Sequence, residues 1–288
     1  MQHRILIASF AAAAVFASTV GVAPVVRAKD EKLKPEQVIA RHLDSIGPAD
    51  KLKGIKTRSI SGSSRVEFRV GGHASLGGDA ILASDGPSLR LALKLPALDY
   101  PGEQFVFDGK DVLIAQINPG NRSPLGTFLF ENDGILKDGL LFGTLTTSWA
   151  FLNNKDAKPL KVDLNGPKKV QGRSVYELKY VPRKGVANII AYFYFDSETF
   201  RHVRSEFKAE VPPTAIGNKI TDSAEPIRYS LAETFDDFKQ VDGLTLPHSY
   251  KVDYSIDSPS GGFVGSWNYA FTQIVHNQPI DRQVFSVK

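Results

Sequence analysis

One run of the chain carries a leucine at every second position: Leu89-Arg90-Leu91-Ala92-Leu93-Lys94-Leu95. Because successive side chains of a strand point to opposite faces, this run predicts a β-strand with one buried and one wet face. Half-solvated strands are typical of antiparallel sheets, whereas strands of parallel sheets are apolar on both faces. The run therefore predicts an antiparallel β protein.

The same period of two recurs along the chain. Alternating apolar positions are found at Val66, Phe68 and Val70; at Tyr176, Leu178 and Tyr180; at Val203, Ser205, Phe207 and Ala209; and at Tyr250, Val252, Tyr254 and Ile256. Turn residues separate such runs at Asp108-Gly109, Asp196-Ser197-Glu198 and Asp242-Gly243, which predicts hairpins between sequential strands. A sheet of about ten strands must curl, because each adjacent pair adds roughly 20 to 25° of twist. The predicted fold class is α+β, a large curled antiparallel sheet forming an open half barrel.

Two apolar segments depart from this alternation, and both indicate that something covers the concave face. Residues 187–195 are apolar at nearly every position, as expected for a central strand covered on both faces. Residues 134–152 carry apolar side chains at helical spacing: Ile135, Leu136, Leu140, Leu141, Leu145, Trp149 and Leu152. This segment is too short, and too interrupted by Asp138, Gly139 and Gly143, to span a bilayer. We expect it to be a helix that covers the concave face.

A shorter helix is predicted near the start of the mature chain. Lys34-Pro35-Glu36 opens it, with proline in its first turn, and Gly47-Pro48 closes it.

The first 28 residues predict export. A basic start at Arg4 is followed by an apolar run and the small-residue pattern Val26-Arg27-Ala28, which is typical of a secretory cleavage site. The predicted organisation is a signal peptide over residues 1–28 and a single half-barrel domain over residues 29–288. The mature protein is expected in the periplasm or secreted, without a membrane-spanning segment; an uncleaved anchor helix is the alternative.

Composition excludes several function classes. The chain has no cysteine, which removes disulfides and thiolate chemistry, and loss of Arg4 and Arg27 with the signal reduces the formal charge from +4 to +2. Without a block of like charges, nucleic-acid binding is not expected. The histidines after residue 28 stand singly at His42, His73, His202, His248 and His276, so neither a metal site nor a cofactor is predicted.

Catalytic motifs are also missing from the sequence. The nearest approach to a serine elbow, residues 72–77, has one residue too many after its first glycine. Pairs of acids such as Asp236-Asp237, and Glu206 with Glu210, are expected on solvated faces, where nothing raises a carboxyl pKa. We therefore predict that the protein is not an enzyme.

The order of elements resembles a known family at four short stretches. These are the helix end Ile46-Gly47-Pro48-Ala49-Asp50-Lys51-Leu52-Lys53-Gly54-Ile55-Lys56-Thr57, the hairpin Phe195-Asp196-Ser197-Glu198-Thr199, the strand pair around Val241-Asp242-Gly243-Leu244-Thr245-Leu246-Pro247, and the closing Pro279-Ile280-Asp281-Arg282-Gln283-Val284-Phe285. Together they resemble the lipoprotein-carrier superfamily of the bacterial envelope, the LolA/LolB-like half barrels, and more closely its uncharacterised exported branch. The resemblance implies an open antiparallel barrel that encloses an apolar cavity for acyl chains or other lipid. The carriers' cavity arginine and membrane-inserting loop have no identified counterpart here, so no functional residue is carried over.

The predicted function is an exported carrier that holds a lipid, acyl chain or other apolar small molecule, with an envelope protein as a further candidate partner. Candidate cavity-lining residues are Leu141, Phe142, Leu145, Trp149, Tyr192 and Tyr194. One alternative is an envelope scaffold or interaction protein whose core is filled and which has no ligand. A second is an envelope hydrolase with a site assembled across strands, which requires a histidine and two acids to converge in a groove.

Overall fold

The strands pair into one antiparallel sheet in a computed structural model that describes residues 33–69, 74–117, 122–152, 161–180, 189–212, 225–259 and 261–287. The predicted signal peptide, Val70 and His73 lie outside these residues. The strands are β1 (Thr57–Phe68), β2 (Ala74–Asp85), β3 (Ser88–Lys94), β4 (Gly102–Phe107), β5 (Val112–Gln116), β6 (Val162–Val170), β7 (Arg173–Tyr180), β8 (Ile189–Asp196), β9 (His202–Val211), β10 (Ile227–Val241), β11 (Leu244–Asp257) and β12 (Phe263–His276).

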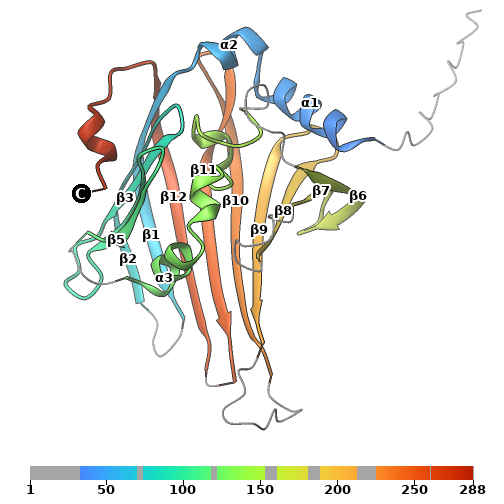
Figure 1. The fold of residues 1–288 in the computed structure, drawn as a ribbon. Coiled ribbons are helices and arrows are strands. Elements are labelled where there is room, and N and C mark those ends of the chain that lie inside the picture. Colours follow the sequence, from blue (N-terminus) through green and yellow to red (C-terminus); the bar gives the residue numbers. More distant parts are fainter. Residues whose placement is uncertain are drawn as a thin grey trace, which may run out of the picture. The chain divides into compact units, whose positions relative to one another are not determined.

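The strand order confirms the predicted hairpin topology. The sheet runs β5-β4-β3-β2-β1-β12-β11-β10-β9-β8-β7-β6, so every sequential pair except β5 and β6 is adjacent. The first five strands build outward from β1 to one edge, and the last seven return from the opposite edge to β12, beside β1 (Figure 1). The sheet is curled and unclosed, with twelve strands where about ten were expected.

This order requires the chain to cross the sheet. Strands β5 and β6 are consecutive in sequence but form the two opposite edges. The connection between them contains the helices α3 (Pro124–Glu131) and α4 (Gly134–Lys137) and the 3-10 turn η1 (Gly143–Leu145). It lies over the concave, inner face of the sheet, as the green segment of Figure 1 shows. We call residues 122–152 the covering segment.

The predicted helix over residues 134–152 is wrong. Only α4 and η1 are helical in this range, because Gly139, Phe142 and Gly143 have φ values of 63°, 68° and 49°, in the left-handed region. A Cβ at Gly139 would lie 2.1 Å from the carbonyl oxygen of Ser148, so the backbone passes too closely for a side chain. The apolar residues at helical spacing therefore lie in a folded loop, where all of them are buried except Leu152, which is partly buried.

The N-terminal helix and the hairpin turns agree with their predictions. Helix α1 (Pro35–Ile46) begins with Pro35 and buries Val38, Ile39, His42 and Ile46, and a short α2 (Ala49–Gly54) follows. Between β10 and β11, Asp242 and Gly243 have φ values of 52° and 83°, as a two-residue hairpin turn with two left-handed residues requires.

The two faces of the sheet bury different clusters. The inner face, α1 and the covering segment share one large apolar core. The outer face carries two small clusters, one of Ala83, Val106 and Phe285 and the other of Val175, Tyr194 and Val203. The first is completed by the C-terminal 3-10 turn η2 (Arg282–Phe285), which follows Asp281. None of the helices in the described ranges is long and apolar enough to cross a membrane.

Candidate functional site

The covering segment starts from a capped helix at one end of the inner face. Ser123 precedes α3, and its Oγ accepts a hydrogen bond from the N–H of Gly126 at 2.9 Å, while Pro124 occupies the first helical position. Arg122 donates from Nε to the carbonyl oxygen of Ile114 on the edge strand β5 at 2.9 Å. The segment is therefore fixed to the sheet edge before it crosses the inner face.

Four of the six predicted lining residues come together on this segment. Leu141, Phe142, Leu145 and Trp149 are all buried in the inner core. The Phe142 ring lies 5.9 Å from that of Tyr250, and the indole of Trp149 stacks on the imidazole of His202 at 4.8 Å. In this closed arrangement the four side chains pack against the sheet and occupy its concave side. Their role in lining a ligand cavity stays a prediction.

The structure places the other two predicted residues on the opposite face. Tyr192 and Tyr194 point outward from β8, where they pack with Val175 and Val203. Their neighbours Phe193 and Phe195 face the inner core instead. The six residues therefore do not form one group, because alternate positions of a strand lie on opposite faces. Sequence reasoning missed Phe193 and Phe195 because the strand is apolar on both sides.

A buried carboxyl fastens the middle of the covering segment. Glu233 on β10 accepts hydrogen bonds through Oε1 from the N–H of Phe142 and from the hydroxyl of Tyr250, both at 2.7 Å. Burial raises the pKa of Glu233 to about 7, although the hydrogen bonds from Tyr250, Phe142 and Ser205 favour the ionised form. This carboxyl thus titrates near neutral pH while it holds the segment.

A buried guanidinium holds the covering segment two residues further along the chain. Arg58 on β1 donates from Nη1 to the carbonyl oxygen of Thr144 and from Nε to His276 at 3.0 Å. Burial lowers the pKa of Arg58 to about 10. Beyond it, the N–H of Thr147 donates to Oγ of Ser84 at 3.0 Å. Side chains of the sheet therefore meet the backbone of the segment at successive points.

A second buried carboxyl lies where the segment begins. Glu103 at the start of β4 accepts a hydrogen bond from the hydroxyl of Tyr100, which in turn accepts one from Nε1 of Trp267 at 2.8 Å. Burial raises the pKa of Glu103 to about 7, against the effect of hydrogen bonds from Tyr100, Ser123 and Trp267. Both buried acids of the inner side thus contact the covering segment or its cap.

A serine and a histidine meet beneath Trp149, which bears on the hydrolase alternative. A register shift between β8 and β9 turns His202 inward, where its Nε2 lies 3.1 Å from Oγ of Ser205. Burial, with neighbouring His42 as the next cause, holds the pKa of His202 well below its usual value. The nearby acid, Glu233, interacts with the serine, whereas in a catalytic triad it contacts the other imidazole nitrogen. All three side chains lie in the packed core, without the open groove that the hydrolase hypothesis requires.

Metal binding finds no support in the described part of the chain, where no three His, Cys, Asp or Glu side chains are grouped to hold an ion. His42 instead contacts the carbonyl oxygen of Phe200 through Nδ1 at 2.8 Å, and burial lowers its pKa to about 4.

No family model and no curated protein matches the sequence. Among solved structures, the chain is similar to a LolA superfamily protein from Nitrosomonas europaea, with 12% identity, 88% of this chain and 98% of that chain covered, and a TM-score of 0.46. It is also similar to a DUF1329 family protein from Desulfovibrio piger and to an outer membrane lipoprotein-sorting protein domain from Vibrio parahaemolyticus. Each of these two shows 11% identity, 87% and 96% coverage of this chain and of its own, and a TM-score of 0.40. The likeness to LolA-like proteins that the sequence predicts is thus found among solved structures, as a likeness of fold at low identity.

Proposed function

We propose that the protein is an exported binding protein, periplasmic or secreted, that holds a lipid, acyl chain or other apolar molecule on the inner face of its half barrel. The observation that carries this proposal is that the inner face is closed by a crossing loop and not by the sheet itself. The ligand takes the place of Leu145 and Trp149 when the covering segment moves outward. In the closed state the segment occupies the binding site.

The exchange of segment for ligand is energetically feasible. Moving the segment away exposes apolar surface of the inner face, at a cost of about 25 cal/mol per Å². An acyl chain that covers the same surface recovers that free energy, and the burial of its own carbon atoms offsets the exposure of the segment's apolar side chains. Binding therefore needs a ligand that matches the inner face in size, and it needs little polar recognition.

The attachments of the segment differ from those of the strands, and we expect them to let it open. Strands in the sheet are held by continuous ladders of backbone hydrogen bonds, but the segment is held to the sheet by separate contacts, among them those from Glu233, Arg58 and Ser84. Left-handed residues at Gly139 and Gly143 interrupt its helical turns, so it does not move as one rigid helix. Regions with few backbone hydrogen bonds open at lower free energy than core strands.

The alternative of a scaffold with a filled core has one observation in its favour. Leu145 and Trp149 have no exposed surface, so the segment already satisfies the inner face without a ligand. This alternative predicts that nothing apolar co-purifies with the protein and that the segment stays closed.

Native mass spectrometry with organic extraction, on protein purified from the cells that naturally produce it, tests the proposal. A stoichiometric lipid that is lost in Phe193→Asp and retained in Tyr192→Asp would support it, since these neighbours on β8 lie on opposite faces of the sheet. Phe207→Asn, a second change on the inner face, replaces Phe193→Asp where circular dichroism shows that the latter does not fold. A ligand-free protein that also leaves fluorescent fatty-acid probes unbound would select the scaffold alternative.

A further inference from the structure

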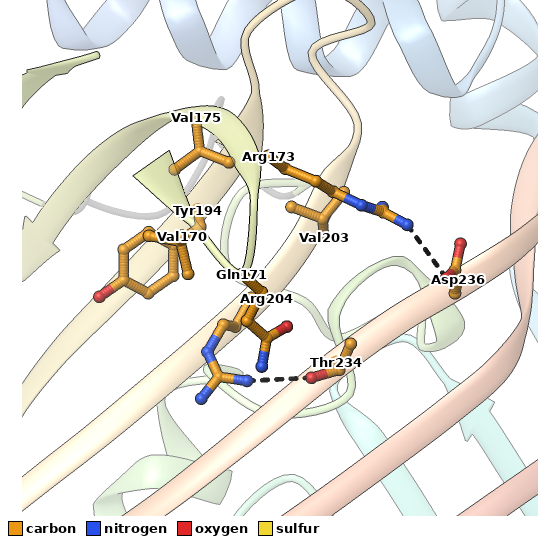
Figure 2. A pocket seen from close by; sticks show the side chains of 9 residues that line it. All are labelled: Val170, Gln171, Arg173, Val175, Tyr194, Val203, Arg204, Thr234 and Asp236. Atoms are coloured by element: carbon orange, nitrogen blue, oxygen red, sulfur yellow. Dashed lines mark hydrogen bonds and ion pairs between the residues drawn. The ribbon is translucent and has the colours of Figure 1, made fainter. Parts of the chain in front are cut away.

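A separate pocket of about 170 Å³ lies on the outer face, where strands β7 to β10 meet the turn between β6 and β7 (Figure 2). Three valines and the ring of Tyr194 line its apolar part: Val170, Val175 and Val203. Polar side chains line the rest: two arginines, a glutamine, a threonine and an aspartate. The pocket is thus amphipathic, and it is separated from the inner face by the sheet.

Arg204 is held in place at this pocket. Its Nε donates to Oε1 of Glu206 at 2.9 Å. Its Nη1 donates to Oγ1 of Thr234 at 3.1 Å, as Figure 2 shows. The side chain is only 14% exposed, so its conformation is restricted. Within the described ranges, no hydrogen bond engages Nη2. A guanidinium fixed through two nitrogens, with the third still able to donate, is prepared to bind an anionic oxygen.

Gln171 has an unusual backbone conformation for its residue type. It has a φ of 50°, followed by 81° at Gly172, so the two residues form the kind of hairpin turn that favours Asn, Asp or Gly at both positions. Glutamine there is strained, and its side chain lies beside Arg204 in the pocket (Figure 2). Strained residues are concentrated at functional sites. The amide of Gln171 adds a second hydrogen-bond donor next to the guanidinium.

The charged side chains that line the pocket are two cations and one carboxylate: Arg173, Arg204 and Asp236. Around them, Arg204 and Lys208 share Glu206, with Lys208 Nζ 2.9 Å from its Oε2, while Arg173 pairs with Asp236 at 3.1 Å. Arg173 also lies close enough to Asp196 to lower the pKa of that carboxyl. The Arg173 to Asp236 pair is half exposed, at 47% and 57%, so it is weak and easily rearranged.

We propose that this pocket binds a small carboxylic acid with a short aliphatic body. The carboxylate accepts hydrogen bonds from Nη2 of Arg204 and the amide of Gln171, and the aliphatic carbons lie on the valines. The volume of about 170 Å³ suits a short aliphatic body and is too small to enclose a folded peptide or a long acyl chain. The site is independent of the apolar ligand proposed for the inner face.

A titration followed by protein NMR, with sodium butyrate as the probe and butyramide as its uncharged counterpart, tests the proposal. We expect saturable butyrate shifts at Tyr194 and Val203 and none with butyramide. Binding should weaken about tenfold in Arg204→Gln and about threefold in Gln171→Gly, which keeps a residue suited to the turn. Arg228→Gln, which removes a half-exposed arginine at the far end of β10, is the control and should leave the affinity unchanged.

Three outcomes would overturn the proposal: no saturable shifts with butyrate, equal shifts with butyramide, or an affinity unaffected by both Arg204→Gln and Gln171→Gly. The second variant keeps the test decisive where the first does not fold. Trp149→Asp, if folded, should bind butyrate as the wild type does, which separates this site from the inner face.

Discussion

Strand β8 presents the contrast between the two faces of the sheet within a few residues. Phe193 and Phe195 point inward to a core closed by the covering segment, whereas Tyr192 and Tyr194 point outward among charged side chains. The hydroxyl of Tyr194 donates to Oε2 of Glu206 at 3.1 Å. Within this strand, the aromatic residues with a polar tip thus lie on the face that reaches water, and those without one lie on the covered face.

This contrast limits the kind of ligand that each face of the sheet can bind. On the inner face the burial is apolar and large, so any ligand there must be apolar and must replace the segment. On the outer face the burial is shallow and mixed with charge, so a ligand there must be small and charged. Substitutions on the two faces of the sheet test this contrast.

The largest effect is expected from truncating the segment's main aromatic anchor. Trp149→Ala should lower the free energy of unfolding by about 3 to 5 kcal/mol, because a fully buried indole leaves a cavity. Tyr192→Ala, on the half-buried outer side, should lower it by less than about half as much. Urea unfolding of both variants measures the difference, and equal losses would contradict the assignment of faces.

The next effect concerns pH. Because the pKa of Glu233 is about 7 in the folded protein and 4.5 normally, the folded state holds its proton more tightly, and this carboxyl's contribution to stability falls as pH rises from about 4.5 through 7. Glu233→Gln removes that contribution and retains an acceptor for Phe142. As pH rises from 5 to 8, the free energy of unfolding of the variant should therefore increase relative to that of the wild type.

Urea unfolding across this range measures the difference between the two proteins, which separates the effect of Glu233 from the opposite effect of the histidines. The lowered pKa values of His42, His202 and His276 make the protein more stable as pH rises toward 6.5. They are present in both proteins and cancel in the comparison. A difference that does not change with pH would show that Glu233 is not buried as described.

A smaller effect is expected from two glycines in left-handed conformations. Gly139→Ala should destabilise the protein by more than about 2 kcal/mol, because its Cβ would collide with the carbonyl of Ser148. Gly172→Ala, with a φ of 81° and open space around it, should cost only about 1 kcal/mol. Thermal unfolding followed by circular dichroism compares them, and a reversed order would argue against the path of the covering segment.

The smallest effect is expected on the outer face. Arg173→Gln breaks an ion pair whose partners are half exposed, so the free energy of unfolding should change by less than about 1 kcal/mol. A larger loss in urea unfolding would mean that the outer pocket contributes to the fold as the inner core does.

The sheet was predictable from the sequence because apolar and polar residues alternate in each strand that has one solvent-exposed face. The alternation of residues 89–95 becomes β3, and the Asp-Gly turns become hairpins. The edge strand β6 was not predicted, since Val162–Val170 is largely exposed and contains Pro167 and two lysines. Edge strands carry such residues to avoid pairing with other chains, and this obscures their period.

The candidate site was only partly predictable. Leu141, Phe142, Leu145 and Trp149 were found because clustered apolar side chains in a long connection indicate burial. The helix itself was mispredicted, since the left-handed conformation at Phe142 has no signal in its residue type. Arg58, Glu233 and Glu103 were missed, because a charged residue in an alternating strand looks solvated until the crossing segment buries it. A register shift that turns His202 inward is likewise invisible in the sequence.

Ligand binding with the covering segment locked to the sheet tests whether the segment must open. The chain has no cysteine, and the N–H of Thr147 donates to Oγ of Ser84 at 3.0 Å, so the double variant Ser84→Cys with Thr147→Cys places one thiol on the segment and one on the strand that it contacts, and mass spectrometry verifies the disulfide after oxidation. The single variant Ser84→Cys is the control. If the segment must open, the oxidised double variant binds a fluorescent fatty acid at least about tenfold more weakly than the same protein after reduction. Equal binding before and after reduction would contradict the account.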